Sequence, residues 1–316
     1  MQNIEQQQLN QTINKLSLCL GDEIVSLLLE GQVDEIMLNA DGKLFSKHSD
    51  GSNCCYGELA LEKAQLAVRT LVSLQGGNIN DKKPIIDGQI ACFNTRFCAL
   101  LPPLVKTPSF CLRLMHSSFF DMQKLISCNF LTQRQAKLID NLIKEKQNLL
   151  ICGQTSCGKT TFINALLNRI GQLEPNSRIV CIEDTPELQL QNYNCLNLYT
   201  NEHTTLSDLV KATLRLSPDR IVVGEVRGHE TLDMVDAMST GHKGTLCSIH
   251  AGSVEQCMQR LRLLISRNAH APKQIEELIS LAIDYLVILK RDPLRHIAAI
   301  AKLEGFKNQQ YQFSYL

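Results

Sequence analysis

A glycine-rich stretch, GQTSCGKTT at residues 153–161, combines residue types and a spacing that could do chemistry. Four residues separate Gly153 from Gly158, Lys159 and Thr160, which fits G-x-x-x-x-G-K-[ST]. The stretch follows an apolar run and opens a helical pattern, so its backbone N–H groups can surround an anion. Lys159 suits the β- and γ-phosphates, and the Thr160 hydroxyl suits Mg²⁺. The predicted site for a nucleoside triphosphate comprises Gly153, Gln154, Thr155, Ser156, Cys157, Gly158, Lys159, Thr160 and Thr161.

Hydrolysis needs a carboxylate that positions water and the metal ion, and two strand ends supply acidic side chains. The segment RIVCIEDTPEL ends its apolar run at Glu183 and Asp184, and RIVVGEVRG ends its run at Glu225. In a parallel sheet these ends lie at the edge where ligands collect, beside the glycine-rich stretch. Glu225 suits the positioning of a Mg²⁺-bound water or general-base work. Acidic residues at strand ends also serve as turn or cap residues, and that alternative stays open.

Two further side chains, His250 and Cys157, are candidates that have structural alternatives. His250 ends the apolar run of GHKGTLCSIHAGS, where it can sense the γ-phosphate; the alternative is a histidine satisfied within the core. A thiol that faces backbone N–H groups at a helix start has a lowered pKa. We therefore hypothesise that Cys157 is the most reactive cysteine and that its oxidation or alkylation blocks nucleotide entry. The alternative is an inert thiol.

The order of apolar runs and helical patterns predicts the elements that position these groups. From residue 132 on, helical patterns alternate with the short apolar runs NLLICG, RIVCIED, DRIVVGE and GTLCSIH. This order is typical of an α/β fold with a parallel sheet and right-handed crossovers. Earlier, DEIMLNADGKLF predicts strand, turn and strand, residues 57–77 a helix ended by Gly76-Gly77, and residues 88–103 a strand.

The change of pattern near residue 132 predicts two domains. We expect an N-terminal α/β domain over residues 1–115, a linker over residues 116–131 and a second domain over residues 132–316. Thr132 is the expected N-cap of the first helix of the second domain.

Composition and charge restrict the classes of protein that the 316 residues can form. Hydrophobic residues make up 44% and charged residues 20%, as in a globular chain. Lys+Arg and Asp+Glu are both 32, aromatic residues are 5% and tryptophan is absent, which argues against a helicase or translocase. No apolar run reaches about 18 residues, so any membrane contact is expected to be peripheral. The 13 cysteines form no C-x-x-C pair and follow no signal peptide, which indicates reduced thiols in a cytosol.

Four segments, in this order, resemble the motifs of secretion ATPases. GQTSCGKTT resembles the Walker A segment, RIVCIEDTPEL the Asp box, LSPDRIVVGEVRG the Walker B-like segment and GHKGTLCSIHAGS the His box. DEIMLNADGKLF and TRFCALLPP in the first domain resemble the conjugative-transfer branch, the TrbB-type ATPases of type IV secretion systems. The resemblance extends from about Leu16 to Lys290.

The resemblance implies a RecA-like P-loop NTPase motor domain with a smaller N-terminal α/β sensor domain. The chain would form a homohexamer at the cytoplasmic face of the inner membrane, with peripheral contact to that membrane. Hydrolysis of ATP with Mg²⁺ would drive pilus assembly and the transfer of DNA or protein, together with other components of the secretion machine. No strong direct binding of nucleic acid is expected.

The resemblance also assigns roles to single residues. Glu183 and Glu225 would be the catalytic carboxylates, with Thr160 and Glu225 at the Mg²⁺ ion and His250 in the sensor position. From the first domain, Arg96 and Arg113 would reach the phosphates, as arginine fingers do.

One departure from the family pattern concerns a charge. Arginine often precedes Pro-Asp-Arg in this family, whereas the chain has Ser217 there. Arg215 or Arg220 would have to compensate, or turnover would be slow.

Two alternative functions stay open at this point. One is a type II secretion or pilus-extension motor, although those motors carry paired C-x-x-C motifs after the Walker B segment and this chain has none. The other is a nucleotide-gated scaffold that binds ATP and barely hydrolyses it; Glu183 and Glu225 argue against that reading and Ser217 favours it.

Overall fold

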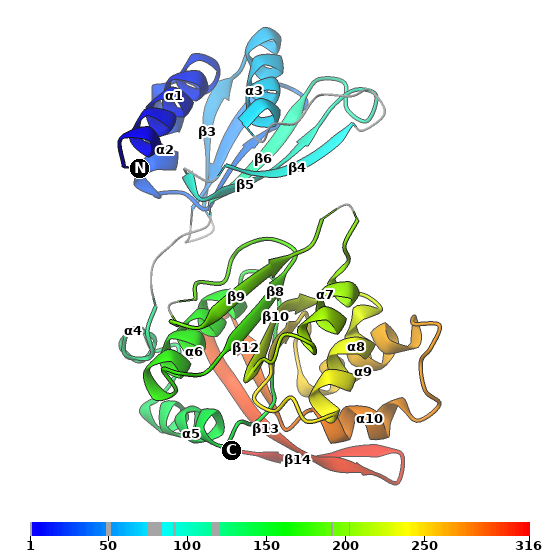
Figure 1. Cartoon of the computed structure of the whole chain (residues 1–316). Helices are drawn as coiled ribbons and strands as arrows, with labels where there is room; N and C mark the ends of the chain where they lie inside the picture. The colour runs from blue at the N-terminus through cyan, green and yellow to red at the C-terminus, as the bar shows by residue number, and fades with distance from the viewer. Residues whose placement is uncertain are drawn as a thin grey trace. The chain divides into compact units, whose positions relative to one another are not determined.

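The structure is a computed structural model that describes residues 2–48, 52–74, 84–90, 93–114, 120–190, 192–201 and 203–316. Its contacts divide the chain into two compact units, Met1–Ser118 and Phe119–Leu316 (Figure 1). Each unit has its own sheet and its own buried core, as a domain does.

An antiparallel sheet of six strands forms the first unit, in the order β3-β2-β1-β6-β5-β4. Leu16 of a helix, Leu71 of another helix and Leu112 of a strand are fully buried in one core, so helices and sheet pack together. The elements are α1 (Gln2–Leu20), α2 (Asp22–Glu30), β1 (Glu35–Leu38), β2 (Lys43–Lys47), β3 (Asn53–Glu58), α3 (Leu61–Leu74), β4 (Ile85–Ile90), β5 (Thr95–Leu100) and β6 (Ser109–Leu114).

One strand prediction for the first unit is confirmed and another is wrong. Residues 34–45 form the predicted strand, turn and strand, and Gly42 has a φ of +84° in the turn. The prediction of one strand over residues 88–103 is wrong, because β4 and β5 are two antiparallel strands. Asn94 adopts a φ of +46° between them, a conformation that asparagine tolerates better than most residues. The predicted helix end at Gly76-Gly77 lies outside the described residues.

A sheet of eight strands forms the second unit, in the order β14-β13-β12-β7-β11-β10-β8-β9. All pairs from β12 to β9 are parallel, and β13 and β14 extend one side antiparallel. The four predicted strands are confirmed as parallel neighbours: β7 (Leu149–Gly153), β8 (Ile179–Glu183), β10 (Arg220–Val226) and β11 (Leu246–Ile249). The other four are β9 (Cys195–Tyr199), β12 (Tyr285–Lys290), β13 (His296–Lys307) and β14 (Gln310–Tyr315).

Helices pack against this sheet in two separate cores (Figure 1). One core holds Ile139 and Phe162, and the other holds Val235 and Leu261. Thr132 caps its helix through a capping box, which confirms the predicted N-cap. The helices are α4 (Met122–Ser127), α5 (Gln133–Lys144), α6 (Lys159–Leu173), α7 (Leu206–Thr213), α8 (Glu230–Ser239), α9 (Val254–Ser266) and α10 (Ile275–Ala282).

Most of the segment predicted as a linker, residues 116–131, belongs to the second unit in the structure. The second unit begins at Phe119, and α4 lies within the segment. Leu125 and Phe130 are buried in the core that contains α6, and the Phe130 ring stacks on Phe162 with ring centroids 5.8 Å apart. Apolar burial therefore fixes most of the segment to the second unit.

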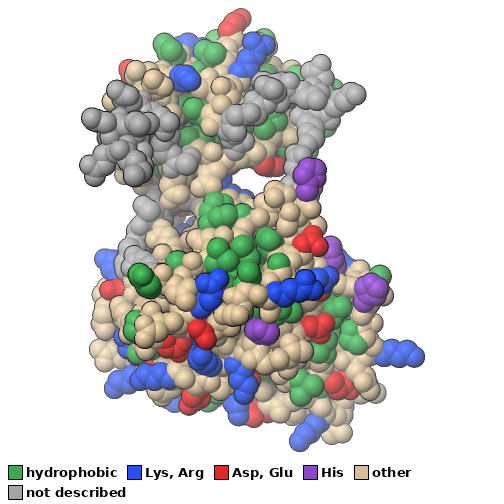
Figure 2. Space-filling model, viewed as in Figure 1, with side chains coloured by type: hydrophobic (Ala, Val, Ile, Leu, Met, Phe, Trp, Pro, Cys, Tyr) green, Lys and Arg blue, Asp and Glu red, His purple; other side chains and the backbone are tan. Residues whose placement is uncertain are grey.

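Two features of the structure concern the expected contacts with membrane and nucleic acid: the apolar stretches and the distribution of surface charge. Within the described ranges, the structure contains no helix with the length and apolar character needed to span a membrane. The apolar run over residues 278–290 is divided between α10 and β12. On the face of the second unit that Figure 2 shows, basic and acidic side chains are interspersed.

Asn148 joins the three central strands at the amino edge of the second sheet. Its side-chain Nδ2 donates to the Ala282 carbonyl at 2.7 Å and the Met238 carbonyl at 3.4 Å, and its Oδ1 accepts the Thr245 N–H at 3.0 Å. Asn148 is 3% exposed, so these backbone groups have no ready access to water. The amide of Asn148, which directly precedes β7, thus satisfies backbone groups of α8 and of the residues before β11 and β12.

Arg220, the first residue of β10, holds a buried charge at the same edge. Its guanidinium is 1% exposed and bonds the Glu174 carboxylate at 2.9 and 2.5 Å, as well as the carbonyls of Gly244 and Ile143. Burial opposes ionisation of Glu174, but the bonds from Arg220 outweigh it and hold the Glu174 pKa below its usual value. Arg220 is thus committed at the amino edge and does not compensate for Ser217 at the phosphate site.

Replacing Asn148 with alanine should destabilise the second unit by about 2–4 kcal/mol, because it leaves buried carbonyl and N–H groups unpaired. Urea unfolding followed by circular dichroism measures the change. Asn141→Ala, on the exposed side of α5, is the matched control and should change stability little. Equal stability of the two variants would contradict the role given to Asn148.

Replacing Glu174 with glutamine should cost about 3 kcal/mol near pH 7, because it leaves the Arg220 charge buried without its counter-ion. Since the folded state lowers the Glu174 pKa, the wild-type advantage is fully present above about pH 4.5 and is lost as pH falls below that value. Urea unfolding from pH 7 to pH 3 should show the difference narrowing. If the difference in unfolding free energy between wild type and Glu174→Gln stays constant with pH, or equals that of the exposed control Glu277→Gln, the stabilising role given to the Arg220–Glu174 pair is wrong.

Candidate functional site

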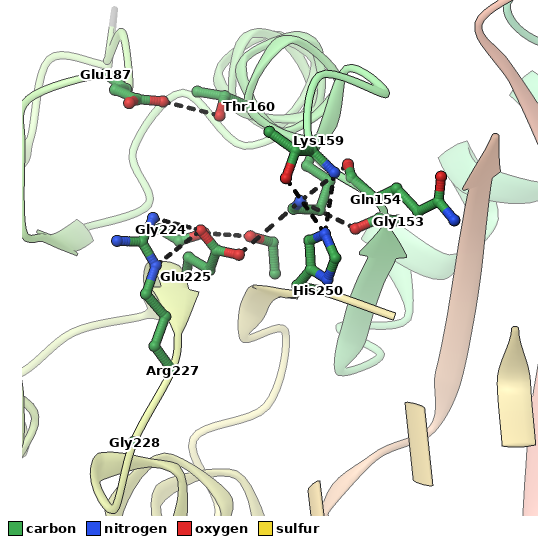
Figure 3. Close-up of polar contacts among 12 residues, drawn as sticks. Gly153, Gln154, Lys159, Thr160, Glu187, Gly224, Glu225, Arg227, Gly228 and His250 are labelled. Carbon is green, nitrogen blue, oxygen red and sulfur yellow. Dashed lines mark hydrogen bonds and ion pairs between the residues drawn. The ribbon is translucent and has the colours of Figure 1, made fainter. Parts of the chain in front are cut away.

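The glycine-rich stretch forms the turn between β7 and α6 at the carboxyl edge of the parallel strands (Figure 3). Gly158 is the N-cap of α6 with a φ of +99°, and Ser156 has a φ of +62°. A Cβ at Gly153 would collide with the Cys157 sulfur and lie 3.1 Å from the Leu289 carbonyl of β12. The first glycine is therefore required by close packing and the second by the backbone conformation.

Lys159 lies between this loop and an acidic side chain of β10. Its Nζ donates to the carbonyls of Gly153 at 3.0 Å and Gln154 at 3.3 Å, and it lies 3.9 Å from Glu225 Oε1 (Figure 3). The Lys159 side chain is only 11% exposed. Its ammonium group is therefore held at the loop, next to a carboxylate.

A second acidic side chain contacts the start of α6. The Thr160 hydroxyl donates to Glu187 Oε2 at 3.0 Å (Figure 3). Glu183, at the end of β8, is 3% exposed, and its Oε1 accepts the backbone N–H groups of Glu187 and Leu188 at 3.0 and 2.9 Å. Glu183 thus holds the turn that carries Glu187, and Glu187 is the carboxylate that meets Thr160. The neighbouring Asp184 instead accepts the Thr200 hydroxyl at 3.1 Å.

Glu225 is bonded to a cation on each side. Its Oε2 accepts Arg227 Nε at 3.1 Å and Nη2 at 2.7 Å, while its Oε1 faces Lys159. The bond from Glu225 raises the pKa of Arg227. These two contacts fix the carboxylate at the carboxyl end of β10, opposite the loop.

His250 follows β11 and contacts the glycine-rich loop directly. The Thr155 N–H donates to His250 Nε2 at 3.1 Å, and the Thr155 hydroxyl lies 3.3 Å from the same nitrogen (Figure 3). His250 is exposed rather than satisfied within the core. Gln154, Thr155 and Ser156 of the loop are exposed as well, whereas Thr161 is half-buried in the first turn of α6.

The hypothesis of a reactive Cys157 is contradicted by the structure. The thiol is 1% exposed and packs over Gly153 instead of facing solvent. Burial raises its pKa, and this effect outweighs the opposing influence of Lys159 and the backbone N–H bonds. Cys157 is therefore the inert, packed thiol of the alternative.

The two arginines of the first unit lie opposite each other on neighbouring strands. Arg96 of β5 and Arg113 of β6 are register partners. Arg113 Nε donates to Glu35 of β1 at 2.8 Å, and the Arg113 side chain is 53% exposed. Their reach to the phosphates remains a prediction, since it depends on the arrangement of the two units.

Three side chains at the second-unit site went unnoticed in the sequence. Glu187 and Arg227 lie inside the quoted segments RIVCIEDTPEL and RIVVGEVRG, four and two residues after the acids that drew attention. Arg295 belongs to no motif, yet its Nε donates to the Ser156 carbonyl at 3.0 Å. Spacing within the first two segments could have revealed Glu187 and Arg227, whereas Arg295 is brought in by sheet pairing alone.

Solved structures share this fold. The VirB11 ATPase of the Brucella suis type IV secretion system is 23% identical, with a TM-score of 0.50 over 93% of this chain and 97% of that one. The DotB ATPase of Yersinia pseudotuberculosis is 16% identical, with a TM-score of 0.64 over 90% of this chain and 79% of that one. At these identities the comparison establishes the common two-domain, RecA-like architecture.

Sequence comparison reaches further than the fold. A conjugal transfer protein TrbB of Rhizobium radiobacter is 33% identical over 302 residues, which cover 95% of this chain and 93% of that protein. The model of the family described as Type II/IV secretion system protein matches residues 74–291, a range that contains the P-loop, Glu183, Glu225 and His250 and most of the second unit. The chain therefore belongs to the type II/IV secretion system protein family, and its resemblance to the TrbB-type members is confirmed along nearly its whole length.

Proposed function

We propose that the chain is the ATPase of a type IV secretion machine for conjugal transfer, which binds ATP with Mg²⁺ at its P-loop and hydrolyses it to ADP and phosphate. The observation that carries the proposal is Lys159, held at the loop 3.9 Å from Glu225 at the carboxyl edge of a parallel sheet. Similarity to the conjugal transfer protein TrbB and to the family as a whole supports the role in transfer.

The residues at this edge fit Mg²⁺ bound to a nucleotide. Mg²⁺ prefers oxygen ligands and keeps several waters when it is bound through one or two carboxylates and phosphate oxygens. The Thr160 hydroxyl would be such a ligand. Glu187 supplies a carboxylate in contact with that hydroxyl, and Glu225 supplies a second carboxylate beside Lys159. Bound Mg²⁺ neutralises developing charge on the phosphates.

The chain's own side chains divide the work around the phosphates. The N–H groups at the start of α6 bind phosphate oxygens, and Lys159 turns from the loop carbonyls toward the terminal phosphates. Glu225 accepts a proton from the attacking water, and Arg227 keeps that carboxylate in place. His250 reports on the terminal phosphate through its contact with Thr155. Glu183 acts by holding the turn of Glu187.

The assembly in the proposal is a homohexamer at the cytoplasmic face of the inner membrane, in peripheral contact with it and with other components of the machine. Arg96 and Arg113 would act when the first unit closes over the nucleotide, where arginine adds about 10³–10⁵ in rate. Arg113 would then exchange its contact with Glu35 for a phosphate, and Lys47, 3.9 Å from Glu35, would remain beside that carboxylate.

Lys159→Ala should lower ATP turnover by about a hundredfold or more, because a positive charge on the terminal phosphates is lost. Phosphate release across size-exclusion fractions measures activity and assembly together, and we expect wild-type activity to elute at the size of a hexamer. Lys137→Ala, which removes an exposed lysine of α5, is the control and should retain wild-type turnover. Undiminished turnover of Lys159→Ala would rule out this site.

Glu225→Gln should lower kcat by about 10²–10⁴ and leave ATP binding nearly unchanged, because the amide keeps the shape of the carboxylate and loses its basicity. Steady-state phosphate release and equilibrium ATP binding separate the two effects. The exposed Glu145→Gln serves as the control for the charge change. A wild-type rate no higher than that of Glu225→Gln would instead support the nucleotide-gated scaffold.

A further inference from the structure

The loop between β12 and β13, residues 291–295, lies beside the P-loop and has no role in the chemistry described above. Because β12 runs parallel to β7 and pairs with it up to Leu289 and Gly153, the loop that follows β12 lies at the ligand edge of the sheet. Arg295 of this loop donates its Nε–H to the Ser156 carbonyl at 3.0 Å. The P-loop is therefore contacted from the β12 side as well as from the side of the catalytic groups.

The tip of the Arg295 guanidinium remains available to a ligand. Among the described residues, Arg295 forms its side-chain hydrogen bond through Nε to Ser156, which leaves both terminal nitrogens as donors. Arg295 is exposed, and its Cδ lies near Gly158, 3.9 Å from where a Cβ would be. Because its Nε is bonded to the loop and its two terminal nitrogens can still donate, Arg295 is well placed to bind an anion held by that loop.

Sheet order determines which part of a nucleotide meets Arg295. The strands run β12-β7-β11-β10, so Glu225 of β10 and His250 after β11 lie on one side of the P-loop strand and Arg295 on the other. If the terminal phosphate lies at Lys159 and Glu225, the nucleoside end of the triphosphate points away from those groups. The nucleoside end then lies toward β12, the side of the P-loop strand on which Arg295 lies.

We propose that Arg295 is a nucleotide-binding residue that contacts the α-phosphate, at the nucleoside end of the bound nucleotide. The inference rests on the proposed nucleotide site and adds a binding residue that lies outside its sequence motifs. Because ATP and ADP share the α-phosphate, Arg295 contributes equally to the binding of both. It acts on affinity and not on the chemical step.

A matched pair of variants separates phosphate contact from mere support of the loop. The Nε2 of glutamine occupies the place of arginine Nε, so Arg295→Gln keeps the bond to Ser156 and loses the charged tip. Arg291→Gln removes the same charge from the same loop and is the control, since the Arg291 side chain forms no hydrogen bond or ion pair with the described residues.

Fluorescence anisotropy of labelled ADP, with ATP as competitor, measures both affinities for the full chain. Arg295→Gln should weaken ADP and ATP alike by roughly tenfold to a hundredfold, as the loss of a charged hydrogen bond does, and Arg291→Gln should match wild type. Unchanged affinities in Arg295→Gln, a loss confined to ATP, or an equal loss in Arg291→Gln would overturn the inference while the nucleotide site stands. Failure of the wild-type chain to bind either nucleotide would remove the site itself.

Discussion

Parallel pairing of β7 with β11 and β12 is the constraint on which the rest of the second unit depends. It brings the P-loop, His250 and Arg295 to one edge of the sheet, although His250 and Arg295 lie 95 and 139 residues along the chain from the P-loop residues that they contact. The same pairing presses β12 against Gly153 so closely that only glycine fits. Neither the loop conformation nor the position of Lys159 would persist if these strands shifted in register.

The two edges of this sheet have separate tasks. At the amino edge, Asn148 and Arg220 satisfy buried backbone groups and hold the strand starts together. At the carboxyl edge, Lys159, Glu225 and His250 make exposed or partly buried contacts that a ligand can replace. Polar groups are therefore fully committed where the fold needs them and exchangeable where chemistry takes place.

Local patterns were sufficient to predict the P-loop, four parallel strands and the Thr132 cap, because short-range spacing and apolar runs encode them. They were insufficient for the turn at Asn94, since alternation continues on both sides of it. The local pattern also did not reveal that Glu187 accepts the hydrogen bond from Thr160. Glu183, the acid that the pattern indicated, instead accepts backbone N–H groups of the turn that carries Glu187. Arg295 and the burial of Cys157 follow from tertiary contacts that no local pattern contains.

The central claim is that the loop from Gly153 to Thr160 binds a polyphosphate beside Glu225. Calorimetric titration of the folded chain with Mg²⁺-ATP at two temperatures tests it most directly, since a heat that vanishes at one temperature reappears at the other. The account predicts saturable binding of one nucleotide per chain. Flat titrations at both temperatures, with the protein folded by circular dichroism, would contradict it.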